Sequence, residues 1–285
     1  MIKLALTDLD DTLIRNGLPR ATDHALAAIH AMLDEGLHFG PVSGRIPKAM
    51  GWMFGNDEAC YQTGALSNGQ MVYIDGELVH AEAIDSALLM DVATTLTELG
   101  DACLCMYDVN CSNEDDSGYF ISPSETHLAW ALATYRHIKH SATELSKPTY
   151  IKANIWTRRD DHDYVLFIRD TLRDKFGELD FVLPSKTAPL IDISPAGWNK
   201  GSATRYLADE LGLTLDEVAV FGDSENDLSM IEAVPNSVAV SNASEQIMRA
   251  SRWHIGASAD DAVADALFEI ARAYQANAMP SFMRG

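Results

Sequence analysis

The sequence is poor in positive charge and has no long apolar run. It carries 21 lysines and arginines against 42 aspartates and glutamates among 285 residues, a formal net charge of −21. Such a chain repels nucleic acid and anionic membranes, so we expect neither as a partner. It lacks the stretch of about 18 apolar residues that a membrane-spanning helix needs. The N-terminal MIKLALTDLDD places acids where a secretion signal is apolar, so we expect a cytoplasmic protein.

Cysteine is scarce as well. The four cysteines, Cys60, Cys103, Cys105 and Cys111, form no C-x-x-C pair and have no histidine at a spacing typical of a zinc site. Cys103 and Cys105 alternate within ACLCMYDV, which is the pattern of one face of a β-strand. We therefore predict reduced thiols that are buried in a strand rather than bound to zinc.

What is present is the composition of a globular protein with two domains. Hydrophobic residues make up 47% of the chain and charged residues 22%, and a typical domain has roughly 150 residues. The run 2–10 predicts a buried strand, 21–36 an amphipathic helix and 37–45 a second strand, which together form a βαβ unit. Helices and strands alternate again from 202 to 276.

The middle of the chain has a different pattern, with helices and strands separated by turn signals. Predicted helices are 86–100, 126–140 and 161–177; predicted strands are 102–109, 118–122, 149–157, 180–185 and 189–194. We therefore predict an α/β fold. A Rossmann-like, doubly wound parallel-sheet core would comprise residues 1–81 and 191–285, and an α/β cap domain of residues 82–190 would be inserted into it.

Carboxylates follow two of the predicted strands. On a strand, Asp8 and Asp10 would point to one face, about 6.6 Å apart. There they could bind a hard divalent cation, or serve as nucleophile and general acid/base. The segment FGDSENDLSM places Asp223 at a strand end and Asp227 one turn later. Parallel sheets place sites at the carboxyl ends of strands, so Asp223 would face the same cation if the two strands are neighbours.

A calcium loop of the EF-hand type is a competing interpretation of D-x-D-x-T. That loop requires glycine at its sixth position and glutamate at its twelfth. Counted from Asp8, these positions hold Leu13 and Pro19, which excludes it.

Two further segments are suited to binding an anion. Ser43 ends the second strand with a hydroxyl group, and the backbone N–H of Gly44 can approach a phosphate closely. Lys200, in GWNKG, lies between a turn and a helix start, where it could act as a point charge for phosphate.

Taken together, these segments resemble the motifs of the haloacid dehalogenase superfamily. Its four motifs are D-x-D-x-T, a serine or threonine at a strand end, a lysine before a helix, and G-D-x-x-x-D. In the same order, the chain offers Asp8, Asp10 and Thr12; Ser43; Lys200; and Gly222, Asp223 and Asp227. The segments GDSENDLSMI and VSNA are similar to the C-terminal pattern of the Cof-like phosphatase group.

The resemblance implies a Mg²⁺-dependent phosphatase that acts on a small phosphorylated metabolite through an aspartyl phosphate. The metabolite would be a sugar phosphate, a nucleotide or a cofactor precursor. Asp8 would be the nucleophile and Asp10 the general acid and base. The implied phosphate ligands are Ser43, Gly44, Lys200 and Asn226, and the implied metal ligands are Asp8, Asp10 (through its backbone carbonyl), Asp223 and Asp227.

Two alternatives remain open at this stage. A phosphotransferase or phosphomutase could use the same scaffold, with a second hydroxyl group favoured over water. The other alternative is a non-catalytic metabolite-binding regulator. Loss of Asp8, Asp10 or Asp223 would favour it, but all three residues are present. No pattern in the chain indicates an oligomeric state.

The chain departs from the family pattern at three positions. Asp11 stands where the family often has glycine after D-x-D, Thr63 replaces the asparagine of N-G-A, and Ala262 replaces a usual glycine. None removes a chemical group from the four motifs. We expect Thr63 to affect substrate choice more than catalysis.

Overall fold

The structure is a computed structural model that describes residues 1–284 except 110–117, 159–160 and 185–188, so Cys111 lies outside the described residues. The chain forms two units. The first, here the core unit, comprises Met1–Arg45, Ala49–His80 and Trp198–Gly285; the second, the inserted unit, comprises Ile46–Lys48 and Ala81–Gly197.

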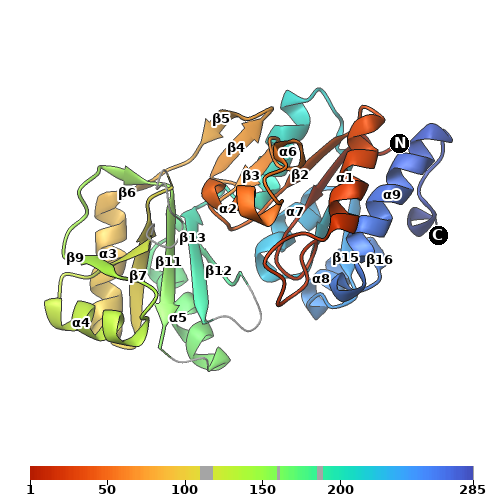
Figure 1. Ribbon diagram of the computed structural model, residues 1–285. Coiled ribbons are helices and arrows are strands. Elements are labelled where there is room, and N and C mark those ends of the chain that lie inside the picture. Colours follow the sequence, from red (N-terminus) through yellow and green to blue (C-terminus); the bar gives the residue numbers. More distant parts are fainter. Residues whose placement is uncertain (110–117, 159–160, 185–188, 285) are drawn as a thin grey trace. The chain divides into compact units, whose positions relative to one another are not determined.

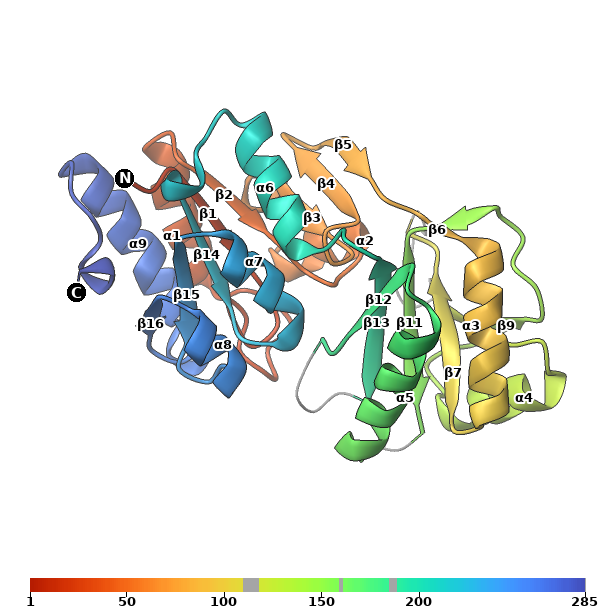
Figure 2. The same cartoon turned by 180° about the vertical axis from the view of Figure 1, so that it is seen from behind.

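The core unit is built on a five-stranded sheet in the order β16-β15-β14-β1-β2, in which neighbouring strands pair in parallel. Helices α1 and α9 cover one face of this sheet (Figure 1), and α6 and α7 cover the other (Figure 2). The elements are β1 (Leu4–Thr7), α1 (Asp23–Asp34), β2 (His38–Pro41), α6 (Lys200–Glu210), β14 (Val218–Gly222), α7 (Leu228–Ala233), β15 (Asn236–Val240), α8 (Glu245–Ala250), β16 (Trp253–Ile255) and α9 (Ala262–Gln275).

A smaller sheet follows β2 along the chain. This part contains α2 (Pro47–Met53), the 3-10 helix η1 (Glu58–Cys60) and the strands β3 (Gly64–Leu66), β4 (Met71–Ile74) and β5 (Glu77–Ala81). The strands form a three-stranded sheet in the order β3-β4-β5.

Local sequence explains where these elements begin and why they are buried. Every residue of β1, β14 and β15 is buried, because helices cover both faces of a doubly wound sheet. Thr22 caps α1, and its hydroxyl accepts a hydrogen bond from the N–H of Ala25. Asn199 caps α6 by accepting from the N–H groups of Gly201 and Ser202.

The inserted unit contains a six-stranded sheet in the order β12-β13-β11-β7-β8-β9, with only the β8–β9 pair parallel among its described pairings. Its elements are β6 (Ile84–Asp85), α3 (Ser86–Leu99), β7 (Ala102–Tyr107), β8 (Gly118–Ile121), α4 (Glu125–Thr134), β9 (His140–Ala142), β10 (Thr149–Tyr150), β11 (Lys152–Thr157), α5 (His162–Lys175), β12 (Leu179–Val182) and β13 (Leu190–Pro195). The predicted class is therefore confirmed: a parallel-sheet α/β core with an inserted α/β domain.

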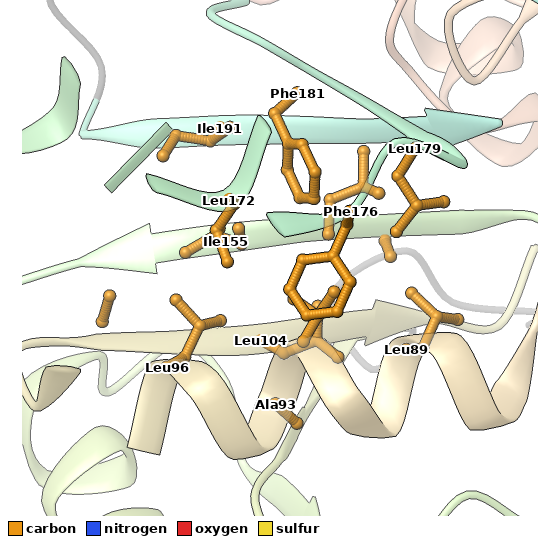
Figure 3. Close-up of a cluster of buried hydrophobic side chains, with 14 of the residues drawn as sticks. Leu89, Ala93, Leu96, Leu104, Ile155, Leu172, Phe176, Leu179, Phe181 and Ile191 are labelled. Carbon is orange, nitrogen blue, oxygen red and sulfur yellow. The ribbon is translucent and has the colours of Figure 1, made fainter. Parts of the chain in front are cut away.

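Both faces of the inserted sheet carry a hydrophobic cluster. Leu89 and Leu96 of α3 point toward Leu104 of β7, and Phe176 and Phe181 fill the same layer (Figure 3). On the opposite face, Cys103 and Cys105 pack with Leu128 of α4. The prediction that these two cysteines are buried strand residues is confirmed.

One predicted helix is too long. Residues 126–140 were expected to be helical throughout, but α4 ends at Thr134 and the chain then turns. His140–Ala142 forms β9, which pairs with β8. Pairing with a sheet edge outweighed the helical periodicity of this segment. No helix in the described part of the chain is both long and apolar enough to cross a membrane.

Candidate active site

The two acid clusters lie at the same edge of the core sheet. Thr7, the last residue of β1, pairs with Phe221 of β14 on one side and with Pro41 of β2 on the other. The N–H of Asp8 donates to the carbonyl of Phe221 at 2.9 Å. The strand adjacency that the sequence analysis required is therefore present. Asp8 and Asp10 follow β1 rather than belong to it, so they need not share a face.

Lys200, the first residue of α6, lies between two of these carboxylates. Its Nζ atom donates to Oδ1 of Asp8 and to Oδ1 of Asp227, each at 2.6 Å. The side chain of Lys200 is completely buried. The sequence analysis assigned this lysine to phosphate alone, whereas the structure shows it bridging two acids.

Asp227 is fixed through both of its carboxylate oxygens. Oδ1 accepts from Lys200, and Oδ2 accepts from the backbone N–H groups of Asp223 and Ser224, at 2.9 and 3.0 Å. The residue is fully buried. Asp227 therefore sets the path of the chain directly after β14, where Asp223 lies.

Asp223 is held by two hydroxyl groups. Thr12 donates to its Oδ1 at 3.2 Å, and Ser224 donates to its Oδ2 at 2.7 Å. Thr12 thus connects the loop after β1 to the loop after β14. The sequence identified Thr12 as part of the D-x-D-x-T motif, but it did not identify Asp223 as the hydrogen-bond partner of Thr12.

The electrostatics of the cluster show an excess of negative charge. Burial, reinforced by repulsion from Asp227, raises the pKa of Asp223 to about 7. Burial also raises the pKa of Asp8 well above its ordinary range, against the opposing effect of Lys200. For Lys200, burial lowers the pKa, but Asp227 and Asp8 outweigh it and the net shift is upward.

The donor set fits a hard divalent cation. Asp8, Asp223 and Asp227 each offer a carboxylate oxygen, and these atoms lie within 4.8 Å of one another. Three carboxylates against one ammonium leave two negative charges uncompensated, which one Mg²⁺ ion would balance. Asp227 accepts from the ammonium of Lys200 and from two backbone N–H groups. The donors to Asp223 are hydroxyl groups, which can rotate away, so Asp8 and Asp223 are better suited to direct contact with a metal.

Asp10 lies apart from this group of three. Its side chain is 52% exposed and forms two hydrogen bonds with Arg45, at 2.8 and 2.9 Å. Sequence reasoning named Ser43 and Gly44 of SGR but missed Arg45, although it follows them directly. The planar fork of an arginine matches a carboxylate through two parallel bonds, as it would match a phosphate.

Ser43 and Asn226 are connected through a residue that sequence reasoning also missed. Ser43 is buried, its hydroxyl accepts from the N–H of Arg45, and its carbonyl accepts from the N–H of Asn68. The side-chain oxygen of Asn68 accepts from Asn226 at 3.2 Å. Oδ1 of Asn226 is buried without a hydrogen-bond partner among the described residues. Gly44, partly exposed, lies in the bend between Ser43 and Arg45.

Comparisons with known proteins identify the family of the chain. The sequence profile of the haloacid dehalogenase-like hydrolase family matches residues 5–267. An HMP-PP phosphatase of Enterobacter sp. (strain 638) is 27% identical over 256 residues, which cover 87% of each chain. A phosphoglycolate phosphatase of Methanosarcina acetivorans is 30% identical over 191 residues, covering 67% of this chain and 77% of the relative.

A solved structure shares the fold over nearly the whole chain. The SMU.1108c protein of Streptococcus mutans UA159 superimposes with a TM-score of 0.78 at 18% identity, covering 97% of this chain and 100% of that one. The resemblance to the haloacid dehalogenase superfamily and its Cof-like group, predicted from four short motifs, is confirmed.

We expect Gly222→Ala to disturb the acid cluster. A Cβ atom at this position would lie 2.6 Å from Cβ and 2.8 Å from Cγ of Asp227, so the carboxylate must shift and its hydrogen bonds weaken. Overpacking of this kind costs about 1–3 kcal/mol, measurable by urea unfolding. Gly177→Ala is the matched control, since its Cβ would meet nothing within 4 Å. Equal unfolding curves for the two variants would contradict the close approach at Gly222.

We expect Lys200→Met to be strongly destabilising. The substitution keeps the length and apolar stem of the side chain but leaves Asp8 and Asp227 as buried acids without a cation. Breaking a buried ion pair in this way costs about 3–5 kcal/mol in the free energy of unfolding. Lys3→Met, which removes a partly exposed ion pair with Glu217, should leave stability nearly unchanged. Similar losses in both variants would show that Lys200 does not hold the cluster.

Proposed function

Because this chain belongs to the haloacid dehalogenase-like hydrolases, we propose that it is a Mg²⁺-dependent phosphatase that hydrolyses a small phosphorylated metabolite. The observation that carries this function is the placement of Asp8. It is a buried carboxylate at a strand end, held by Lys200 and grouped with Asp223 and Asp227. That arrangement suits an attacking group whose phosphate target must be attracted by a cation.

Asp8 and Asp223 would hold Mg²⁺ directly, with the Asp10 backbone carbonyl as the further contact that the family resemblance implies. Asp227 would hold these ligands in place without contacting the metal, through its hydrogen bonds with Lys200 and with the backbone of the 223–224 segment. The bound ion would neutralise charge on the cluster and on the phosphate, which the net charge of −21 otherwise repels.

Asp8 and Asp10 would then share the chemistry. An Asp8 oxygen attacks phosphorus and the bond to the leaving oxygen breaks. Asp10, which must have left Arg45 and taken up a proton before this step, gives the leaving oxygen that proton. Asp10 next takes a proton from water, which cleaves the aspartyl phosphate and restores Asp8. The exposed position of Asp10 allows it to reach solvent, provided that Arg45 releases it.

The remaining predicted residues would position the phosphoryl group. Two of the three N–H donors of Lys200 bind Asp8 and Asp227, so one is left for a phosphoryl oxygen. The other phosphoryl oxygens would be bound by Ser43, the backbone of Gly44, and Asn226. Asn68 links Ser43 to Asn226 through hydrogen bonds, which supports this grouping.

The substrate is proposed at the level of its class. The two curated relatives are named for HMP-PP and for phosphoglycolate, and both names describe a small phosphorylated molecule. We propose that the inserted unit, predicted as 82–190, serves as the cap that selects among such molecules.

A cytoplasmic location is consistent with the free thiols of Cys60, Cys103 and Cys105.

Asp8→Asn should abolish phosphate release, by at least about a thousandfold, because the nucleophile is lost. Asp10→Asn should instead slow the second step and trap phosphate on Asp8. Release from p-nitrophenyl phosphate and from a panel of phosphorylated metabolites measures the first effect, and intact-protein mass spectrometry detects the second.

Asp209→Asn, an exposed acid on α6, is the control and should retain full activity. Parental turnover by Asp8→Asn would refute the assigned nucleophile. Formation of an isomerised product without free phosphate would identify a transferase or mutase instead of a hydrolase.

Stabilisation by Mg²⁺ should increase with pH. Without metal, the pKa of Asp223 is about 7 in the folded chain against an ordinary value of 3.8. The folded state therefore holds the extra proton between these values, and the metal-free protein loses stability as pH rises through this window. A bound cation requires the ionised carboxylate and reverses that loss.

Thermal unfolding with EDTA or with excess Mg²⁺ tests this at about pH 5.5 and about pH 8. The rise in Tm caused by Mg²⁺ should be larger at the higher pH, and Asp223→Asn should reduce the difference. A metal effect that is equal at both pH values would show that Asp223 does not titrate with binding.

A further inference from the structure

A second group of side chains with metal-binding atoms lies in the core unit and shares no residue with the acid cluster. His30 belongs to α1, Asp57 immediately precedes η1, and Cys60 is the last residue of η1. Nε2 of His30 is 2.6 Å from Oδ2 of Asp57 and 3.9 Å from Sγ of Cys60. The three donor atoms all lie within 4.8 Å of one another.

We infer that His30, Asp57 and Cys60 form a binding site for a divalent transition-metal ion such as Zn²⁺. Imidazole nitrogen, thiolate sulfur and carboxylate oxygen are the three donors that zinc uses in proteins. A hard cation such as Mg²⁺ selects oxygen donors and avoids sulfur. The two metal-binding groups of the core unit therefore differ in the ion that they favour.

The distances agree with tetrahedral coordination after a small adjustment. With zinc bonds of about 2.0–2.3 Å, nitrogen and sulfur ligands lie about 3.6 Å apart, and nitrogen and oxygen ligands about 3.3 Å. The sulfur–nitrogen distance of 3.9 Å is close to this value. The His30–Asp57 pair, at 2.6 Å, would open by about 0.7 Å as the ion enters between the two atoms.

One ligand of the site is buried, and the other two are partly exposed. Cys60 is completely buried, whereas the side chains of His30 and Asp57 are 44% and 33% exposed. An ion can therefore enter from solvent and keep a water molecule as fourth ligand. The Asp57 carboxylate does not cap η1 although it stands at the cap position, so metal binding would not cost a helix cap.

The charges of the ligands would match a divalent ion. In the metal-free chain, the Cys60 thiol is buried close to the Asp57 carboxylate. Binding would break the S–H bond, form an S–Zn bond and release the proton to solvent. The thiolate and carboxylate then balance the two positive charges of the ion. A nucleophilic cysteine, by contrast, needs an exposed thiolate, which Cys60 does not provide.

A bound ion would join α1 to the segment that ends in η1, two parts of the core unit separated by about one helix and one strand in sequence. The site takes no part in the proposed phosphatase reaction. Its presence or absence is therefore decided independently of that reaction.

Cobalt(II) is the probe, since it replaces zinc in such sites and reports thiolate ligation by a sulfur-to-cobalt charge-transfer absorption. The purified chain is titrated with Co²⁺ in excess Mg²⁺, which occupies the acid cluster. We expect the charge-transfer band to saturate at one ion per chain and to disappear when Zn²⁺ is added. Cys60→Ser should remove the band, and His30→Gln or Asp57→Asn should weaken Co²⁺ binding at least about tenfold.

Cys103→Ser is the control and should keep the band, because Cys103 is buried in the inserted sheet. His30→Gln and Asp57→Asn alter partly exposed side chains, so they keep the test decisive if Cys60→Ser fails to fold. Absence of the band in the parent chain would overturn the proposal. A band that survives Cys60→Ser, or Co²⁺ binding equal in parent, His30→Gln and Asp57→Asn, would overturn it as well.

Discussion

The buried ammonium group of Lys200 is the interaction on which the candidate active site depends. It joins the start of α6 to Asp8 after β1 and to Asp227 after β14, with no exposure to solvent. Asp227 in turn accepts from the N–H groups of Asp223 and Ser224. A buried ion pair of this kind is weak evidence for stability, because desolvation opposes the attraction. Its contribution here is position: three carboxylates that repel one another are held at one edge of the sheet.

The remaining negative charge explains how an acidic chain can act on a phosphate. Lys200 compensates only one of the three buried carboxylates. The pKa of Asp223 is raised first by burial and then by the charge of Asp227. A divalent cation would satisfy the cluster and at the same time attract the phosphoryl group. Without a cation, the buried carboxylates repel one another and also repel phosphate. With a divalent cation bound, the site would attract a phosphate instead.

Simple periodicity predicted much of the fold and part of the site. Apolar runs that end in acids predicted β1 and β14. The rule for parallel sheets placed Asp8 near Asp223 only on the condition that these strands are neighbours, and the structure shows that they pair. The partners of individual side chains were not predictable. Nothing local in SGR indicates that Arg45 binds Asp10, or in GWNKG that Lys200 bridges two acids. The Cys60 group was missed for the same reason: His30 is 30 residues away on another element, outside any spacing rule.

Two of the three departures from the family pattern, Asp11 and Thr63, hydrogen-bond to the backbone of nearby residues. Asp11 has a φ of 60°, the left-handed region in which glycine is free of strain, and its carboxylate accepts from the N–H of Asn16. The hydroxyl of Thr63 accepts from the N–H of Asp75, which joins the residues flanking β3 and β4. The expectation that Thr63 affects substrate choice stays a prediction, because a hydroxyl that accepts from Asp75 can still donate a hydrogen bond.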